Sequence, residues 1–570
     1  MTPRTAADWI ARARSLEAAG DLAGARKTLA DASTTCPGDP VIANAAGNLA
    51  MRAGDIGSAE RSFAAASKAD PGHCEYALNH AIALQRLGRA GEALEILRAV
   101  EREGATIAKY GSVRASCARE VGELAEAARW YDAAIARDPG YKLALHGRAR
   151  VAIERGEADA LARFDRALQV NPGEADLWLG KAQALEVDGN SQGARVIAEQ
   201  LCDQAPGFIA ALTFHAGLLL AAGEKDFAAP FRKAAARAPQ DPNIAAAHIE
   251  TLAGLDHAAQ AADIAAEARE RFPREPHFTL LEAVHAGSAG QWERAEALWA
   301  QCPIDNPMRA LHEARHRIRS GEIARADALL DRVLAANPWD ISGWALRGIV
   351  WRLSGDNRAQ WLHEQAKLVQ LRPLEAREGL LGDVTGELRA LHSRSAMPLG
   401  QSLRGGTQTR GILFHRTEPL LAELHEAIRT TLASYRADLP VRDDSHPLLR
   451  HREDNWRLAG SWSVRLTGGG SGAGDYHTAH IHPLGIVSSA LYLVVPAAAH
   501  GGGKGGWLEV GRPPPDLGLD LPPLRSIEPQ EGHLALFPST LYHGTTRFGG
   551  AGAQSAERMT VAFDVVSLPR

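Results

Sequence analysis

Four histidines in the last third of the chain are spaced so that they could hold a metal ion. His477, His480 and His482 lie close together in the run Asp475-Tyr-His-Thr-Ala-His-Ile-His-Pro, and His543 follows much later. In an extended segment, residues two apart point to the same face, so His480 and His482 can bind one cation while His543 approaches from another strand. Imidazole suits iron, zinc, copper and nickel, so the pattern predicts a metal centre without choosing its metal. Taken without His543, the run could also be a polar loop rich in histidine.

The segment that carries these histidines is predicted to be rich in strands. From Asn455 onward, short runs of β-branched and aromatic residues are separated by turns rich in glycine and proline. The expected strands cover residues 461–466, 487–495, 506–510, 533–537 and 560–566. Helical patterns over 379–391 and 418–435 precede them. A compact β-barrel or sandwich with one or two helices in front satisfies this order.

A repeat fills the first two thirds of the chain. Glycines from Gly20 to Gly355 and prolines from Pro37 to Pro373 recur at roughly 34-residue steps, each series with one position skipped. Each unit is predicted to be two helices, because glycine permits a left-handed helix stop and proline suits the start of the next helix. Near Leu255–His257 the glycine is out of phase, since Gly254 comes early.

Four tryptophans gather at the end of the repeats, at Trp339, Trp344, Trp351 and Trp361. We expect them to pack where the repeats meet the following domain, although a patch that binds a peptide is the alternative.

The composition excludes several classes of function. Lys plus Arg number 63 against 68 Asp plus Glu, for a net charge of −5, so we expect no nucleic-acid partner. The chain has no run of about 18 uncharged apolar residues, so we expect no membrane span. Asp8 and Arg12 interrupt any secretory signal at the start of the chain, and the five cysteines are scattered. Both features favour a cytoplasmic protein.

Two family resemblances follow from these residues. Residues 1–375 resemble tetratricopeptide repeats in about eleven copies, which implies an all-α superhelical solenoid that binds a protein or peptide. Residues 376–570 resemble the 2-oxoglutarate- and Fe(II)-dependent oxygenases, in the form that follows such repeats in bacterial proteins. This implies a double-stranded β-helix of the jelly-roll or cupin-like kind. The segments that carry the second resemblance are 401–409, His482-Pro483, 529–533, 537–539 and 558–564.

The oxygenase resemblance implies roles for particular residues. His480, His482 and His543 would hold Fe(II) at the catalytic centre, and Arg558 and Thr560 would bind the far carboxylate of 2-oxoglutarate. A guanidinium suits that task because it meets a carboxylate with two parallel hydrogen bonds. Tyr492 would donate a hydrogen bond to the co-substrate, or it is a plain core aromatic. The remaining co-substrate would be O2, and hydroxylation of a C–H bond the default reaction.

Position 482 departs from the family pattern, in which an acid is commonest there. Either three neutral imidazoles hold the metal, which leaves more positive charge on the ion, or a nearby acid such as Asp475 or Glu509 takes the third place. We favour His482. His477 is then a reserve ligand, or a residue that contacts a ligand or the substrate.

The leading hypothesis is that the solenoid captures a protein or peptide and the second domain hydroxylates one of its side chains. Fusing the two raises the effective concentration of the substrate. The alternatives are the same chemistry on a small molecule, and an interaction scaffold that senses metal or has lost catalysis. A zinc hydrolase on a cupin-like barrel is disfavoured, because residues 376–570 contain no His-Glu-x-x-His motif.

Overall fold

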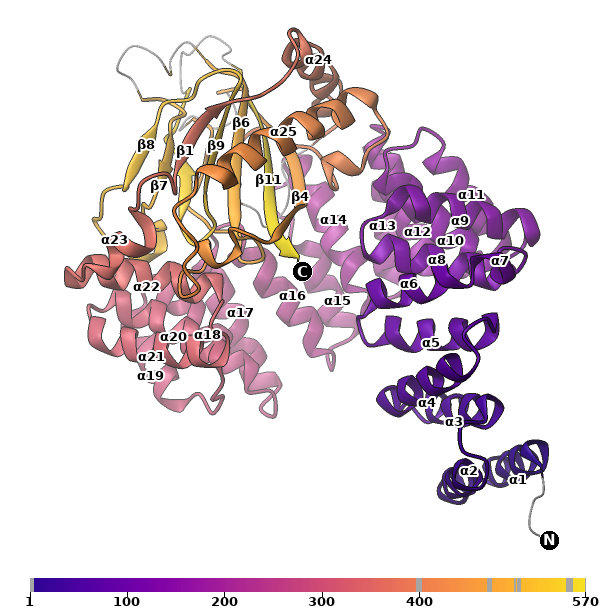
Figure 1. The fold of residues 1–570 in the computed structure, drawn as a ribbon. Helices are drawn as coiled ribbons and strands as arrows, with labels where there is room; N and C mark the ends of the chain where they lie inside the picture. Colours follow the sequence, from indigo (N-terminus) through magenta and orange to yellow (C-terminus); the bar gives the residue numbers. More distant parts are fainter. Residues whose placement is uncertain are drawn as a thin grey trace. The chain divides into compact units, whose positions relative to one another are not determined.

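The computed structural model describes residues 5–395, 402–468, 474–496, 499, 504–549 and 557–568. The chain folds into two compact units, Met1–Ala184 and Leu185–Arg570 (Figure 1). This division falls inside the repeats, and the predicted domain boundary between residues 375 and 376 stays a prediction. No helix in the described part of the chain combines the length and the apolar character needed to cross a membrane.

The first unit is a series of paired helices packed around small and aromatic residues. Many of its buried positions are alanine, which lets neighbouring helices approach closely, and Tyr110, Trp130 and Phe164 fill the larger spaces. Its helices are α1 (Ala6–Ala18), α2 (Leu22–Thr35), α3 (Pro40–Arg52), α4 (Ile56–Ala69), α5 (Cys74–Arg86), α6 (Ala90–Ala99), α7 (Glu101–Gly104), α8 (Ala108–Glu120), α9 (Leu124–Arg137), α10 (Lys142–Glu154) and α11 (Ala160–Val170), with α12 (Ala175–Val187) crossing the division.

The glycine series turns the chain between the two helices of each repeat. Every glycine of the series from Gly20 to Gly355 has a positive φ, between 64° and 85°. Such angles cost glycine little because it lacks a Cβ. In the repeat where the glycine is out of phase, Asp256 takes the left-handed position with φ 65°, and Gly254 is right-handed with φ −65°. Aspartate is among the few other residues that visit this region.

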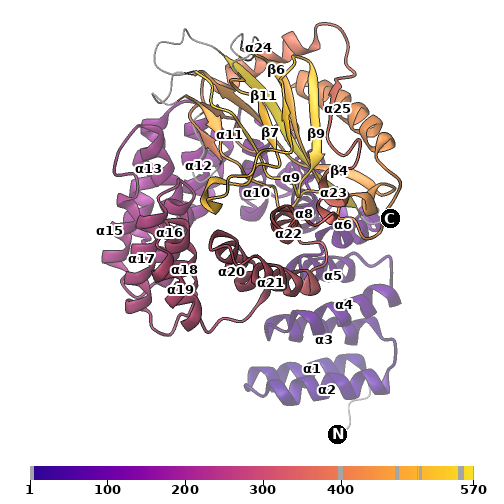
Figure 2. The same ribbon diagram turned by 90° about the vertical axis from the view of Figure 1, so that its left-hand side faces the viewer.

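The second unit continues the repeats and then changes to strands. Figure 2 shows its first helices as a curved row. They are α13 (Ser191–Gln204), α14 (Ile209–Ala221), α15 (Ala229–Arg237), α16 (Pro242–Ala253), α17 (Ala258–Arg271), α18 (His277–Ser288), α19 (Trp292–Gln301), α20 (Pro307–Arg319), α21 (Ile323–Ala336), α22 (Ile341–Ser354) and α23 (Arg358–His363). The prediction of a helical solenoid followed by a region rich in sheet is therefore confirmed.

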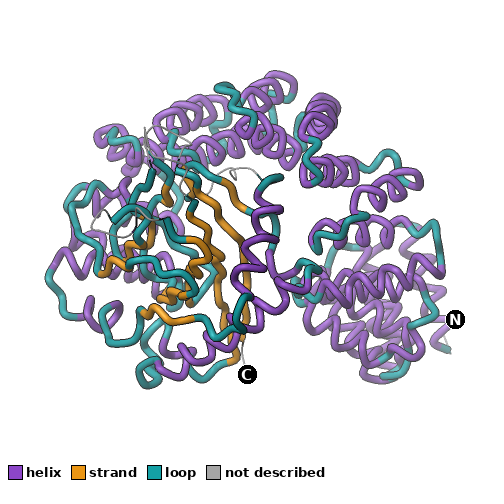
Figure 3. Tube along the Cα trace, turned by 90° about the horizontal axis from the view of Figure 1, so that it is seen from above, coloured by secondary structure: helices purple, strands orange, loops and turns teal. Residues whose placement is uncertain are grey.

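The strands of the second unit gather in one place (Figure 3). A six-stranded antiparallel sheet has the order β1-β9-β6-β11-β4-β3, a three-stranded sheet has the order β10-β7-β8, and β2 pairs with β5. The strands are β1 (Gln370–Pro373), β2 (Leu403–Arg404), β3 (Thr407–Gln408), β4 (Asn455–Leu466), β5 (Tyr476–His477), β6 (Val487–Val494), β7 (Leu508–Val510), β8 (Arg525–Ile527), β9 (His533–Pro538), β10 (His543–Thr545) and β11 (Arg558–Leu568). Strand β1 precedes residue 375, so the large sheet includes residues that the sequence assigned to the solenoid.

Two helices cover one face of the six-stranded sheet. They are α24 (Leu380–His392) and α25 (Pro419–Asp438), and α25 crosses the strands in Figure 1. Val561, Phe563 and Val565 of β11 are buried in the core between this sheet and the helices. Because side chains alternate along a strand, Arg558, Thr560, Ala562 and Asp564 point to the opposite face.

The last repeats and the strands share a hydrophobic core. Leu517 and Tyr542 are buried in the same cluster as residues of α20–α23, including Trp351. Trp361 packs against this cluster, and its Nε1 donates a hydrogen bond of 2.8 Å to the carboxylate of Asp443. For Trp344, Trp351 and Trp361, the prediction that the tryptophans pack where the repeats meet the next domain is confirmed.

Candidate metal centre

The backbone brings His480 opposite His543. The N–H of His480 donates to the carbonyl of His543 at 3.0 Å, and the N–H of His543 donates back at 2.9 Å. His482 lies two residues further on, and the ligand nitrogens of the three imidazoles all lie within 4.8 Å of one another. Within the described part of the chain, no other three His, Cys, Asp or Glu side chains are grouped in this way.

Each of the three imidazoles has a hydrogen-bond acceptor at Nδ1. The acceptors are the Thr478 carbonyl at 2.9 Å for His480, the Leu541 carbonyl at 3.2 Å for His543, and the Asp564 carboxylate for His482. Carbonyl and carboxylate oxygens only accept hydrogen bonds, so Nδ1 carries the proton in each ring. The Nε2 lone pairs remain for a metal, and acceptors at the other ring nitrogen are what metal-binding histidines usually have.

The spacing of the rings fits a bound cation. The Nε2 atoms of His480 and His482 are 3.0 Å apart. With both protons on Nδ1, these atoms face each other as two acceptors, and a cation between them removes the repulsion. Two nitrogens bound to one ion at about 2.1 Å and at a right angle are themselves about 3.0 Å apart. The donor set therefore fits a metal ion that binds imidazole.

Burial favours the uncharged form of His480 and His543, which metal ligation requires. Desolvation, together with the neighbouring His482, lowers the pKa of His480 to about 3. Desolvation and the adjacent imidazoles also hold the pKa of His543 well below its usual value. The carboxylate of Asp564 contacts Nδ1 of His482 and so places a negative charge beside the cluster.

Arg558 and Thr560 line the same cavity as the three imidazoles. Arg558 is only 2% exposed, its Nε has no hydrogen-bond partner among the described residues, and burial lowers its pKa. A buried guanidinium with an unpartnered N–H is costly, so this position fits an anionic ligand such as a carboxylate.

Tyr492 lies beside Arg558 and is not part of the cavity wall. Its ring centre is 5.5 Å from the guanidinium carbon. It packs between the two sheets with Phe537 and Leu508, and burial raises its pKa to about 12. Its hydroxyl has no hydrogen-bond partner in the described part of the chain. Its predicted hydrogen bond to a co-substrate stays a prediction.

The acids considered as third ligands lie outside the cluster. Asp475 accepts hydrogen bonds from the backbone N–H groups of Thr467 and Gly468, at 3.0 and 2.9 Å. Glu509 pairs with Arg512, at 2.9 Å from Oε1 to Nη2. The cluster as it stands consists of imidazoles alone.

His477 lines the cavity without joining the cluster. Its Nδ1 is 3.2 Å from the hydroxyl of Ser402, which is also 3.3 Å from Nε2 of His480. This position suits a residue that contacts a ligand or the substrate.

Asp564 is a residue of the site that the sequence analysis did not single out. The available signal was its spacing, because Arg558, Thr560, Ala562 and Asp564 alternate along one strand. Such alternation places a carboxylate on the same face as the guanidinium. A short loop carries His482 to this strand, and no local pattern reveals that meeting.

Two family models match the chain. Residues 460–564 match the family described as "Putative 2OG-Fe(II) oxygenase", and this stretch includes the histidine cluster, Arg558 and Asp564. Residues 44–106, 78–142 and 145–207 match the tetratricopeptide repeat. The resemblance to a repeat protein with an oxygenase domain is thereby confirmed. The oxygenase family implies Fe(II), 2-oxoglutarate and O2 as cofactor and co-substrates, and repeats of this kind generally bind protein or peptide partners.

Known proteins resemble part of the chain. Cellulose synthase operon protein C of Pseudomonas fluorescens (strain SBW25) is 26% identical over 259 residues, or 43% of this chain and 20% of that protein. The chain thus spans about a fifth of the length of this curated relative. A tetratricopeptide repeat protein from Parabacteroides merdae ATCC 43184 is 19% identical, with a TM-score of 0.36, over 43% of this chain and 97% of its own. Pseudomonas aeruginosa PilF is 16% identical, with a TM-score of 0.33, over 37% and 96%. At these identities the likeness concerns the fold alone.

Proposed function

We propose that the chain is a 2-oxoglutarate- and Fe(II)-dependent hydroxylase that acts on a protein or peptide bound by its repeats. The observation that carries this proposal is the convergence of three Nε2 lone pairs in one cavity with the buried, unpartnered Nε of Arg558. The pair of antiparallel sheets that hold these residues supports a double-stranded β-helix of the jelly-roll kind.

Different residues of the chain bind the metal and the co-substrate. His480, His482 and His543 hold the metal, and the acceptors at Nδ1 fix the orientation of each ring. When bound, Fe(II) supplies the oxidising chemistry with O2 and 2-oxoglutarate. Arg558 binds the far carboxylate of 2-oxoglutarate with its guanidinium, and Thr560, which points the same way, donates its hydroxyl.

Asp564 supplies the negative charge that an acid at position 482 would otherwise supply. In a site with two histidines and one carboxylate, the acid offsets one positive charge of the ion. Here the carboxylate of Asp564 does so through the imidazole of His482. With Fe(II), dianionic 2-oxoglutarate and the guanidinium of Arg558 counted, the formal charges of the site cancel. This balance favours an oxygenase over a scaffold that has lost its chemistry.

The proposed substrate class rests on the repeats, and the proposed compartment rests on the cysteines. Repeats of this family present surfaces to peptides and partner proteins, which favours a polypeptide substrate. The scattered free cysteines favour the cytoplasm.

Anaerobic spectroscopy tests the chemistry without requiring the substrate. The full chain is loaded with Fe(II) under nitrogen and titrated with 2-oxoglutarate, and a metal-to-ligand charge-transfer band is the expected result. Oxygen is then admitted and succinate is measured. His543→Ala should abolish the band, and Arg558→Ala should weaken the binding of 2-oxoglutarate while the bound Fe(II) is retained.

His533→Ala is the matched control, because His533 lies in the same domain outside the cavity and its Nδ1 is 3.0 Å from the backbone carbonyl of Glu531. It should behave as the wild type. A wild-type chain that binds Fe(II) but gives neither band nor succinate is a scaffold, and the proposal fails.

A further inference from the structure

A groove of about 1,020 Å³ runs between the last repeats and the strands of the second unit. On the repeat side, the first helix of each of four successive repeats contributes an apolar residue: Ala253, Val284, Leu311 and Leu346. On the strand side, the apolar residues include Tyr476, Ile481, Pro514 and Tyr542. Both walls belong to the same compact unit.

The groove is continuous with the candidate metal centre. His477, His480, Gly544 and Thr545 line both the groove and the cavity of the three imidazoles. A molecule that fills the groove therefore lies beside the reacting position, which is where the substrate of the proposed oxygenase must lie.

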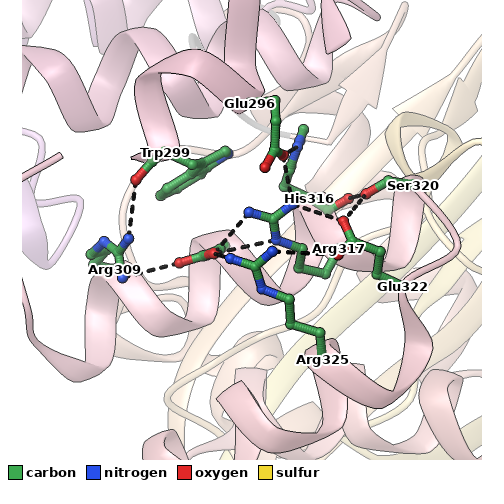
Figure 4. A network of polar contacts seen from close by, with 9 residues as sticks. Glu296, Trp299, Arg309, His316, Arg317, Ser320, Glu322 and Arg325 are labelled. Carbon is green, nitrogen blue, oxygen red and sulfur yellow. Dashed lines mark hydrogen bonds and ion pairs between the residues drawn. The ribbon is translucent and has the colours of Figure 1, made fainter. Parts of the chain in front are cut away.

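The repeat wall is held in place from both sides of α20. On the strand side, Arg315 and Arg319 both bind the carboxylate of Asp516, which for Arg315 lies at 2.7 Å. On the other side, Arg317 is 1% exposed and pairs with Glu313 at 3.0 Å and Glu322 at 2.7 Å (Figure 4). Because this network braces α20, the groove is formed before any ligand arrives.

Most charged groups of the groove have a charged partner. Asp516 pairs with Arg315, Glu509 with Arg512, and Asp256 with Arg404, whereas Arg547 lies at 4.0 Å over the neutral ring of Tyr476. His285 and His312 also line the groove, and burial lowers the pKa of each to about 4, so both are uncharged at neutral pH. The groove thus offers apolar surface and neutral polar groups, which favour a ligand without charge.

The length of the groove favours a polymer over a small molecule. The helices α16, α18, α20 and α22 are neighbours in turn. At 8–10 Å between the axes of neighbouring helices, three steps span roughly 25–30 Å. An extended chain rises about 3.3 Å per residue, so this span holds about eight residues. Small-molecule pockets commonly have volumes of about 300–1,000 Å³, and this groove, at about 1,020 Å³, is at the upper limit.

We propose that this groove binds an uncharged stretch of an extended polypeptide, and that this segment presents its side chain to the metal centre. The inference rests on the proposed function and specifies its substrate: a segment of about eight residues, without Asp, Glu, Lys or Arg at its middle positions. The repeats that select it are those of α16–α22, which lie in the same compact unit as the metal centre.

Affinity selection from a peptide library tests this proposal. The probe is an equimolar library of capped synthetic peptides of about ten residues, offered to the full chain with Fe(II) and 2-oxoglutarate under nitrogen. Retained peptides are identified by mass spectrometry. The wild type should enrich peptides whose central stretch is uncharged.

His312 and Ser342 both line the repeat wall of the groove, far along the chain from the metal ligands, and replacing either with glutamate places a negative charge there. His312→Glu and Ser342→Glu should each lower the yield of the enriched peptides at least tenfold, with the charge-transfer band and the substrate-free succinate rate unchanged. His533→Glu introduces the same charge outside the groove and should leave the selection unaltered.

The outcomes separate the two proposals. Three results would overturn the peptide groove: the same enrichment in both groove variants as in the wild type, enrichment of charged peptides, or a normal charge-transfer band without any enrichment. Enrichment that depends on His312 and Ser342 but is accompanied by no charge-transfer band supports the groove and contradicts the proposed oxygenase chemistry.

Discussion

Asp564 is the residue at which the proposed metal centre can be tested most sharply. Its carboxylate accepts a hydrogen bond from Nδ1–H of His482, and its side chain is 19% exposed. Asp564→Ala removes both the acceptor and the negative charge. Partners of this kind change metal affinity by about 10–100-fold, which corresponds to about 1.4–2.7 kcal/mol. Asp564→Asn keeps an oxygen that can accept the hydrogen bond from Nδ1–H of His482, but it loses the negative charge. Because a charge-assisted hydrogen bond is about twice as strong as a neutral one, we expect about half that free-energy loss.

The assay is anaerobic titration of Fe(II) followed by the 2-oxoglutarate band. His482→Ala should weaken metal binding more than Asp564→Ala does, and adding Asp564→Ala to His482→Ala should have little further effect, because the carboxylate acts through that ring. The matched control is Asp454→Asn, since Asp454 accepts from Nδ1 of His451 at 2.8 Å outside the metal cavity. Wild-type affinity in Asp564→Ala, or losses that simply add in the double variant, would refute the reasoning.

Three further predictions concern binding and stability. Arg558→Lys keeps the charge but loses the forked geometry, so the affinity for 2-oxoglutarate should fall about tenfold at unchanged Fe(II) affinity, measured by titration of the band. Asp516→Ala removes the carboxylate that Arg315 and Arg319 share, and should lower the free energy of unfolding by about 2–3 kcal/mol, measured in urea. Burial lowers the pKa of His446 to about 4 and of His363 to about 3, so both are neutral when folded. The unfolded chain protonates them below about pH 6.5, so stability should be full above that pH. It should fall as the pH drops towards 4, by up to about 3 kcal/mol for His446, and His446→Asn should flatten the profile.

The repeats could be predicted from the sequence because their signals are local and recur. Glycine at the left-handed position and helical spacing of apolar residues are properties of a few consecutive residues. Even the irregular repeat was visible as a shift of phase at Gly254. The sequence did not show that Asp256 occupies the left-handed position, because an exposed aspartate is compatible with many conformations.

The long strands were predictable, and of the short ones only β7 lies within a predicted run, residues 506–510. β4, β6, β9 and β11 have enough residues for alternation or a continuous apolar run to be recognised. β2, β5 and β10 have two or three residues and gain their strand character from their partners. β1 was missed for another reason: it directly follows the repeats and its pairing with β9 joins residues far apart in the chain.

The site shows the same limit. The sequence grouped His480 and His482 by their two-residue spacing and added His543 by its residue type. The structure brings all three together. Asp564 could not be assigned, because its meeting with His482 depends on a loop between β5 and β6. The groove could not be predicted from the sequence either. Its two walls come from segments far apart in the chain, and only the cluster of tryptophans indicated that these segments meet.

The last repeats and the strands share one hydrophobic core, and this changes the physical reason for joining the repeats and the second domain in one chain. Tethering raises the effective concentration of a substrate when two modules move independently. Leu517 and Tyr542 instead pack in one core with α20–α23, and Asp516 binds two arginines of α20. These repeats act as a preformed wall of the substrate groove, and a preformed wall lowers the ordering cost of binding. The tethering argument then applies to residues 1–184, which have a core of their own around Tyr110 and Trp130. Charge placed on the repeat wall should therefore change which peptide is selected, whereas removal of the first unit should change only how tightly a larger protein is held.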